Sequence, residues 1–180
     1  MTRAEALEIS TDGPPVEGSV DLDVPVADLW DCFNKPHLWP AWNPCMRWVR
    51  NRSLVRGSTL VWVFEPIRSS YMYRLPATAR IVEVEPEARA TWEVVALPGF
   101  FARHTYFMED LGDSRSRFGS WEKAMGPTFR MTSRFWMAHF QFVCDRSLEG
   151  ARRLEQAFLE HGRLDDELVS SLSAPHRSRR

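Results

Sequence analysis

Three polar side chains in strand-like stretches have the types and the spacing to do proton-transfer chemistry. His104 and Tyr106 are two residues apart in an alternating run, so on a strand both side chains point to one face. Such a pair can act as general acid and base in the enolisation of a ketone, and Arg80 can hold a carboxylate or a developing enolate. The competing interpretation makes His104 a hydrogen-bonded core residue, Tyr106 a rim residue and Arg80 a surface partner of a strand neighbour. Both interpretations stay open, and the predicted catalytic residues are His104, Tyr106 and Arg80.

The sequence also predicts an apolar chamber around these polar groups. It contains 8 Trp, 11 Phe and 3 Tyr among 180 residues, enough ring area for a ligand cavity or for a large core. The more apolar register of each strand defines its inner face, and one side of a long helix faces the same space. The predicted ligand-binding residues are Trp39, Trp42, Trp62, Phe64, Trp92, Tyr106, Phe135, His139 and Phe142. Rings with a few polar groups are the usual lining of a small-molecule pocket.

Some members of this set have structural alternatives. Trp39 and Trp42 either form the mouth of the pocket or staple their short helix to the sheet. His139 either points into the cavity or is packed and hydrogen-bonded among rings. Glu122 is either exposed or, if buried, needs a partner.

The order of the expected elements explains how these residues come together. Residues 16–24 alternate weakly as a strand, a helix begins at Pro25 or Val26, and Pro36 and Pro40 bracket a second, very short helix. Strand-like runs follow, separated by turn signals, over residues 46–51, 58–65, 71–84, 89–97, 101–110 and 115–124. Short connections between these runs favour an antiparallel meander. Pro76 predicts that the 71–84 run is an edge strand, bulged or split.

A long helix completes the expected domain. Gly126 and Pro127 end the strand series, and residues 131–161 are predicted to form one helix that stops at Gly162. Its first half is apolar nearly all round, so we expect more than a sheet face to cover it there. The expected organisation is a flexible N-terminal segment (1–15), one domain (16–162) and a mobile, partly helical tail (163–180).

Composition and charge argue against several classes of protein. With 23 Lys and Arg against 24 Asp and Glu, the formal net charge is -1, and no basic stripe indicates nucleic-acid binding. No apolar run approaches the length of about 20 residues that a membrane-spanning helix needs, and residues 1–15 do not resemble a signal peptide. Three cysteines without CxxC spacing indicate reduced thiols and a cytoplasmic location. Because phosphate-loop, metal-ligand and iron–sulfur motifs are missing, we expect neither a metal nor a cofactor.

Several short motifs connect this order of elements to a known family. They are Val24-Pro25-Val26 with Leu29-Trp30-Asp31, the spacing from Asn34 to Trp39-Pro40, Gly57 before a strand, Gly126-Pro127 before the helix, and Gly150-Ala151 with Leu154. Over residues 16–161 the sequence resembles the SRPBCC superfamily, which includes START lipid-binding domains and the polyketide cyclase/dehydrase family. The resemblance implies an α+β helix-grip fold: a curved antiparallel sheet of about seven strands around a long C-terminal helix, with two short helices after the first strand.

Three functions follow from the resemblance, and a structure can separate them. The first is binding of a hydrophobic small molecule (a lipid, a polyketide or an aromatic compound) in an open apolar cavity, by a monomer or a homodimer. The second is a cofactor-independent enzyme similar to polyketide cyclases, in which Arg80, His104, Tyr106 and His139 polarise carbonyls and move protons in a closed cavity. The third is an interaction module similar to Hsp90 activators, with a filled core and functional residues on the outside.

Overall fold

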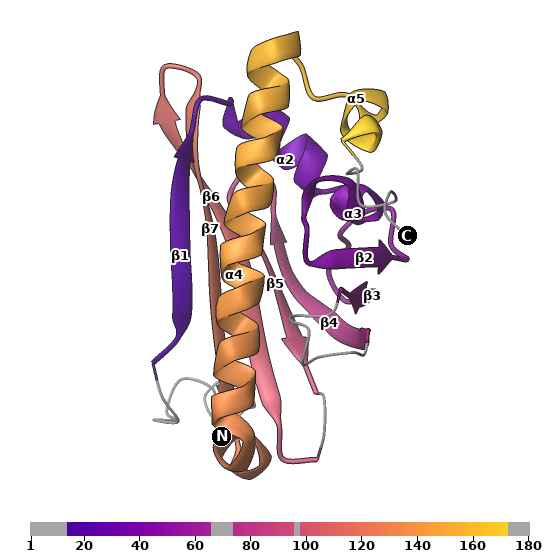
Figure 1. The fold of residues 1–180 in the computed structure, drawn as a ribbon, viewed down its shortest axis with the longest axis vertical. Helices are drawn as coiled ribbons and strands as arrows, with labels where there is room; N and C mark the ends of the chain where they lie inside the picture. Colours follow the sequence, from indigo (N-terminus) through magenta and orange to yellow (C-terminus); the bar gives the residue numbers. More distant parts are fainter. Residues whose placement is uncertain (1–13, 66–73, 96–97, 173–180) are drawn as a thin grey trace, which may run out of the picture.

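The computed structural model describes residues 14–65, 74–95 and 98–172 and shows a 7-stranded sheet curled around one long helix (Figure 1). All neighbouring strands are antiparallel, in the order β1-β7-β6-β5-β4-β3-β2. The strands are β1 (Val16–Leu22), β2 (Met46–Val49), β3 (Thr59–Phe64), β4 (Leu75–Glu85), β5 (Arg89–Val94), β6 (Phe101–Gly112) and β7 (Arg115–Met125). The helices are α2 (Val26–Phe33), η1 (Pro36–Leu38), α3 (Trp39–Trp42), α4 (Pro127–His161) and α5 (Asp166–Ser171). The predicted helix-grip fold is confirmed.

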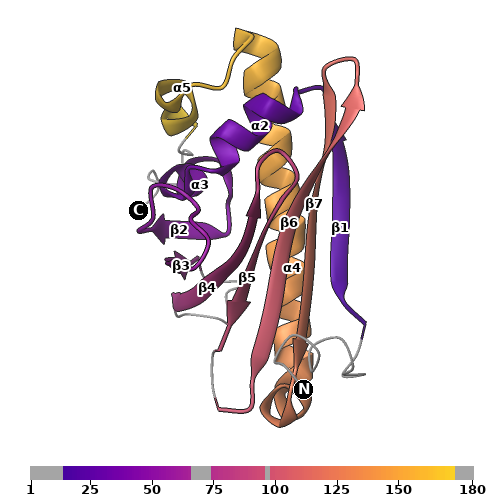
Figure 2. The same ribbon diagram turned by 180° about the vertical axis from the view of Figure 1, so that it is seen from behind.

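The short helices carry the chain from one edge of the sheet to the other. The first strand pairs with β7, whereas the next strand in sequence, β2, pairs with β3 at the opposite edge. Pro25 precedes α2, which buries Leu29, Trp30 and Phe33. Seen from behind, α2 and α5 lie near the C-terminal end of α4, and the N-terminal end of α4 projects away from them (Figure 2). The two ends of α4 therefore lie in different surroundings.

α4 starts earlier than predicted, at Pro127, and ends where predicted. Gly126 has a φ of 105°, and a Cβ there would lie 2.2 Å from the carbonyl oxygen of Gly99, so only glycine fits this turn. At the other end Gly162, with a φ of 71°, donates its N–H to the Phe158 carbonyl over 2.6 Å. The expectation that the first half of the helix is covered all round is wrong. Met131 is 88% exposed and Phe135 is 39% exposed.

Alternation predicted the inner face of three strands correctly. On β3, Leu60, Trp62 and Phe64 are buried, and on β6 the same is true of His104, Tyr106 and Met108. On β5, where we expected Trp92, Val94 and Ala96 to face inward, Trp92 is buried and Val94 is half-buried, and Ala96 lies outside the described residues. Because β6 pairs with β5 and β7 in this register, their inner side chains form one continuous surface facing α4.

We expected Arg80, Val82 and Val84 to share the inner face of β4; Val84 does pack against the core, and the prediction is wrong at Arg80. Arg80 is exposed, whereas its neighbours Ala79 and Ile81 are buried. Of the three alternatives for this strand, the edge position is wrong, because β4 lies between β3 and β5, whereas an irregularity of the bulge type is present, between Ile81 and Glu83. An irregularity of this kind changes which side chains share a face. Arg80 therefore does not join His104 and Tyr106.

Part of the predicted C-terminal tail is folded. Asp165 caps α5 by accepting the N–H of Leu168 over 2.9 Å, and Leu164 and Val169 are buried against the main core. The expected flexible segment 1–15 and the end of the tail, 173–180, lie almost entirely outside the described residues, so those expectations stay predictions. Within the described ranges, no helix is both long and apolar enough to cross a membrane.

Candidate functional site

A pair of buried ionisable side chains lies on the inner face of the sheet. The register places His104 opposite Glu122, and Tyr106 opposite Ser120. His104 Nδ1 lies 3.3 Å from Glu122 Oε2, and its Nε2 lies 3.1 Å from Ser120 Oγ. All four side chains are buried. A carboxylate that accepts from Nδ1–H leaves Nε2 as the acceptor of the imidazole, which is the arrangement of a general base held in one tautomer.

Tyr106 belongs to a separate hydrogen-bond network that reaches α4. Its hydroxyl lies 2.5 Å from Ser147 Oγ, which donates to the Val143 carbonyl over 2.7 Å and accepts from Asn43 Nδ2 over 3.1 Å. Since the single Ser147 proton goes to Val143, the Tyr106 hydroxyl is the donor to Ser147. Burial raises the pKa of Tyr106 well above its ordinary value of 10.0. In this geometry the phenol holds the helix to the sheet.

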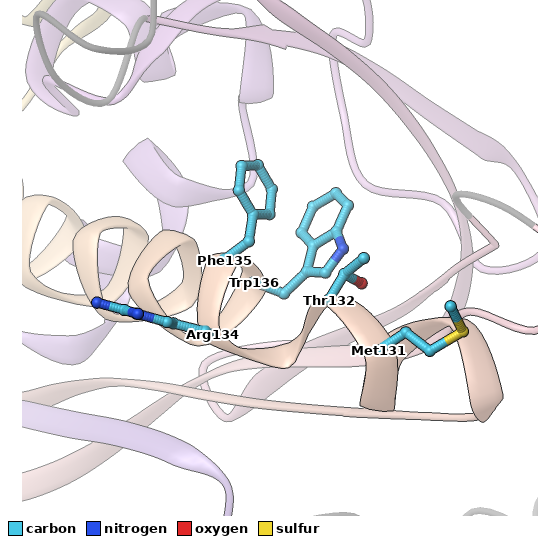
Figure 3. A pocket seen from close by; sticks show the side chains of 5 residues that line it. All are labelled: Met131, Thr132, Arg134, Phe135 and Trp136. Atoms are coloured by element: carbon cyan, nitrogen blue, oxygen red, sulfur yellow. The ribbon is translucent and has the colours of Figure 1, made fainter.

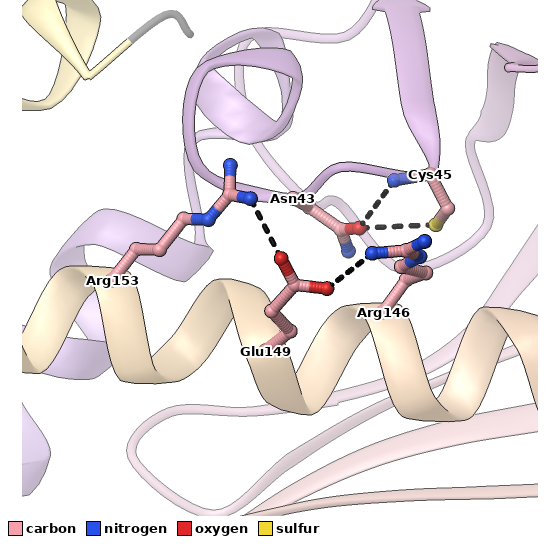
Figure 4. Close-up of polar contacts among 5 residues, drawn as sticks. All are labelled: Asn43, Cys45, Arg146, Glu149 and Arg153. Atoms are coloured by element: carbon pink, nitrogen blue, oxygen red, sulfur yellow. Dashed lines mark hydrogen bonds and ion pairs between the residues drawn. The ribbon is translucent and has the colours of Figure 1, made fainter.

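Asn43 extends this network to the start of β2. Its Oδ1 accepts from the backbone N–H of Cys45 over 3.1 Å and from its thiol over 3.0 Å (Figure 4). Burial raises the pKa of the Cys45 thiol to about 12, so this cysteine is not a thiolate nucleophile at neutral pH. The same view shows Glu149 between Arg146 and Arg153, on the side of α4 that faces the segment with Asn43 and Cys45. Such exposed pairs contribute little to stability.

Aromatic rings fill the interior beside Tyr106. Ring centroids lie 5.3 Å apart for Phe33 and Trp39, 5.8 Å for Trp39 and Trp92, and 5.4 Å for Tyr106 and Phe118. The indole N–H of Trp39 donates to the Phe33 carbonyl over 2.8 Å. Trp39 is therefore a core side chain in this structure, which supports the staple interpretation.

Trp42 also packs in the interior, against α4. A Cβ at Gly150 would lie 2.8 Å from the Trp42 ring and 2.8 Å from its backbone oxygen, so α3 and α4 touch where α4 has no side chain. The Trp42 ring is buried. Like Trp39, it joins a short helix to the rest of the fold.

A second ring cluster lies toward the N-terminal half of α4. Phe64 contacts Trp62 and His139, with centroids 5.6 Å and 4.9 Å apart. Trp136 contacts His139 at 5.7 Å and Phe135 at 5.0 Å. The cluster thus links β3 to α4. Two buried polar atoms in it, His139 Nδ1 and Trp62 Nε1, have no hydrogen-bond partner.

A surface pocket opens next to this second cluster. It has a volume of about 660 Å³ and is lined by Met131, Thr132, Arg134, Phe135 and Trp136 (Figure 3). In the close-up the rings of Phe135 and Trp136 project to the same side of α4, whereas Arg134 extends along the helix. The pocket is therefore mainly apolar, and Trp136 links it to His139.

The structure brings the predicted ligand-binding residues into two groups. Trp39, Trp92 and Tyr106 lie in the filled core with Trp42 beside them, and Trp62, Phe64, Phe135 and His139 lie at or behind the pocket. Phe142 is half-buried, with the Arg146 guanidinium 5.4 Å from its ring centroid. Arg80 belongs to neither group.

Sequence reasoning missed three polar residues of these networks and left a fourth open. Ser120, Ser147 and Asn43 were not singled out, and Glu122 was left between exposure and burial. For β7 a signal existed, because Phe118, Ser120, Glu122 and Ala124 alternate in phase with the buried residues of β6. Within the described residues, no group of three or more His, Cys, Asp and Glu side chains is arranged to hold a metal ion.

Comparisons with known proteins agree with this fold. A family model described as polyketide cyclase/dehydrase and lipid transport matches residues 14–154. A search of curated proteins found no match. Among solved structures, a protein from Nitrosomonas europaea is 18% identical, with a TM-score of 0.60 over 86% of this chain and 99% of that chain.

Two further structures carry functional names. The di-domain ARO/CYC BexL is 17% identical, with a TM-score of 0.53 over 83% of this chain and 46% of that chain. Truncated norcoclaurine synthase from Thalictrum flavum is 11% identical, with a TM-score of 0.52 over 79% of this chain and 94% of that chain. At these identities the likeness shows a shared fold.

Proposed function

Because the chain belongs to the polyketide cyclase/dehydrase and lipid transport family, we propose that it binds an apolar small molecule through the pocket on the N-terminal half of α4. The ligand is a lipid, a polyketide or an aromatic compound. The observation that carries this proposal is the pocket itself, about 660 Å³ in volume and lined by Met131, Phe135 and Trp136. All five lining residues belong to α4, so the pocket is open to solvent and covers one side of a bound molecule.

Exposure of the lining side chains supplies the driving force. Met131 and Phe135 remain 88% and 39% exposed, whereas Phe140, Val143 and Leu154 of the same helix are buried. Covering one such side chain with a ligand stabilises the complex by up to about 1.5–3 kcal/mol. Grouped apolar side chains that stay exposed on a folded domain commonly mark a binding surface.

A fluorescence titration with an apolar dye tests the binding proposal. The wild-type protein should bind the dye saturably, and hydrophobic competitors should displace it. Phe135→Ala should weaken binding roughly tenfold, because one ring of the lining is lost. Leu159→Ala is the matched control, since Leu159 is a 62% exposed apolar residue of the same helix far along the chain from the pocket. Equal affinity in both variants, or no saturable binding by the wild type, would contradict the proposal.

The buried pair of His104 and Glu122 favours a second function, that of a cyclase-like enzyme. In this proposal His104 Nε2 releases Ser120, takes a proton from the carbon between two carbonyl groups, and is stabilised as imidazolium by Glu122. The resulting enolate carbon attacks a second carbonyl of the same substrate. The new alkoxide takes the proton back from His104, so the step needs no cofactor and consumes no other reactant.

Turnover of a linear polyketone tests the enzyme proposal. His104→Gln should lower turnover roughly a hundredfold, the usual contribution of a general base, while a melting curve checks that the variant is folded. Arg80→Ala is the control and should keep full activity, because Arg80 is exposed on the far face of the sheet. Unchanged turnover in folded His104→Gln would remove His104 from the chemistry.

The remaining sequence predictions complete the proposal. We infer a single binding domain over residues 16–162 with flexible ends, in the cytoplasm, as a monomer or a homodimer. The interaction-module alternative gains support only from the filled ring core beside α2, and the pocket on α4 favours binding of a small molecule.

A further inference from the structure

Polar atoms buried behind the pocket indicate the chemistry of the ligand, and this inference rests on the binding function proposed above. We propose that the ligand is a neutral ring compound with a hydroxyl or carbonyl group, and that His139 Nδ1 and the indole N–H of Trp62 recognise that group. The pocket side chains hold the apolar part of the molecule. The neutral polar group then reaches the interior between α4 and β3.

Two buried side chains in the ring cluster behind the pocket each have a polar atom without a partner. His139 and Trp62 are each only 4% exposed, and neither His139 Nδ1 nor Trp62 Nε1 has a hydrogen-bond partner. Both rings contact Phe64, at 4.9 Å and 5.6 Å between centroids, although they come from different elements. Buried polar groups are nearly always paired in folded proteins, and leaving one unpaired is costly. Other buried atoms of the described residues, such as Trp42 Nε1, are also unpaired, but His139 and Trp62 both contact Phe64 in the ring cluster next to the pocket. Their position beside the pocket therefore points to a polar partner on the ligand.

The rings around His139 carry no charge. The rings that touch His139 belong to Phe64, Trp136 and Phe140, which are all uncharged. Burial lowers the pKa of His139 below its ordinary value of 6.5, against a smaller opposing effect of Glu122, so the imidazole is neutral at pH 7. A carboxylate placed here would lose its hydration without gaining a cation, and Glu122 would repel it. The interior accepts a neutral group.

The hydrogen-bonding capacity of these two atoms further restricts the polar group that the ligand can carry. An indole N–H can only donate, so Trp62 needs an oxygen acceptor. A neutral imidazole nitrogen accepts or donates according to its tautomer. A hydroxyl group can pair with either atom, since its oxygen can accept from Trp62 and its proton can go to a nitrogen of neutral His139. A carbonyl oxygen can accept from Trp62, or from His139 when that residue carries its proton on Nδ1.

Access to His139 passes through Trp136. This half-buried ring lines the pocket (Figure 3), and its centroid lies 5.7 Å from that of the His139 ring. Turning the Trp136 side chain toward the open pocket lets a flat ring take its position. The ligand ring then stacks among aromatic side chains, and its polar group lies beside His139.

Three ligands of nearly equal shape test the proposal with the wild-type protein at pH 7: naphthalene, 2-naphthol and 2-naphthoate. Calorimetry or tryptophan fluorescence gives each Kd. 2-Naphthol should bind roughly fivefold to tenfold more tightly than naphthalene, the net effect of one or two buried hydrogen bonds. 2-Naphthoate should bind more weakly than naphthalene. Tightest binding of 2-naphthoate would overturn the inference in favour of charge recognition by Arg134.

Variants of His139 and Trp62 test whether these two side chains recognise the hydroxyl group of 2-naphthol. His139→Phe and Trp62→Phe should each abolish most of the preference for 2-naphthol while leaving naphthalene bound. The controls His161→Phe and Trp48→Phe change an exposed histidine and an exposed tryptophan and should keep the preference. Equal binding of naphthalene and 2-naphthol by the wild type would refute this inference while leaving the binding function intact. Failure of all three ligands to bind would refute the binding function itself.

Discussion

Removing the Ser147 hydroxyl should destabilise the fold far more than removing the Tyr106 hydroxyl. Ser147 Oγ accepts from both Tyr106 and Asn43 and donates to the Val143 carbonyl. Ser147→Ala therefore leaves two donors, the Tyr106 hydroxyl and the Asn43 amide, buried without an acceptor. Tyr106→Phe removes one donor, and Ser147 keeps its other two partners.

The magnitudes follow from that difference. Each unpaired buried donor costs about 1–3 kcal/mol, so Ser147→Ala should lower the free energy of unfolding by about 2–6 kcal/mol, less about 0.5 kcal/mol regained from the higher helix propensity of alanine. Tyr106→Phe should cost about 1 kcal/mol, the net value of one hydrogen bond.

Urea denaturation at constant m-value measures both variants. Ser133→Ala, on the same helix, is the control for propensity, because its hydroxyl makes only an exposed bond to the Arg130 carbonyl. If Ser147→Ala is no less stable than Tyr106→Phe, the Tyr106 hydroxyl does not donate to Ser147. The Tyr106 proton would then be available for catalysis.

Further predictions concern packing, pH and thiol chemistry. Gly150→Ala should destabilise the protein by about 1–2 kcal/mol in a melting experiment. The added Cβ meets the Trp42 backbone at 2.8 Å, and the cost of this overpacking exceeds the gain in helix propensity. An unchanged melting temperature would contradict the close approach of α3 and α4. The free energy of unfolding should fall as the pH drops below about 6.5, because the lowered pKa of His139 means that the unfolded chain takes up a proton that the folded chain does not. His139→Phe should remove this part of the pH dependence. Identical pH profiles for the variant and the wild type would show that His139 is protonated in the folded protein. Cys45 should react with a thiol reagent only as fast as the protein unfolds, because burial raises its pKa to about 12; fast labelling of the native protein, located by mass spectrometry, would contradict its burial.

Local patterns predicted the parts of the fold that local physics determines. The inner faces of β3 and β6 follow from alternation, because a slip of one residue would send Trp62 or Tyr106 to solvent. The end of α4 follows from Gly162, whose left-handed conformation stops the helix.

Contacts between distant elements determine the features of the fold and the site that the sequence did not predict. The inner face of β4 depends on a register shift at Ile81–Glu83, which nothing in the strand's own alternation marks. Ser147 meets Tyr106 because of how α4 lies across the sheet, and Glu122 meets His104 because of pairing between β6 and β7. The apolar first half of α4 predicted coverage, yet Met131 and Phe135 line an open pocket. The apolar pattern thus identified a segment with unusual surroundings, but it did not predict that Met131 would stay exposed.

We propose that an apolar ligand binds between the pocket on α4 and the ring cluster behind it. The indole N–H signals of the 8 tryptophans in a ¹H–¹⁵N spectrum test it most directly during a titration with 2-naphthol. The signals of Trp136 and Trp62 should shift saturably, whereas Trp39, hydrogen-bonded to the Phe33 carbonyl, and the exposed Trp48 should stay in place. Stationary signals of Trp136 and Trp62, with or without a shift of Trp48, would contradict the account.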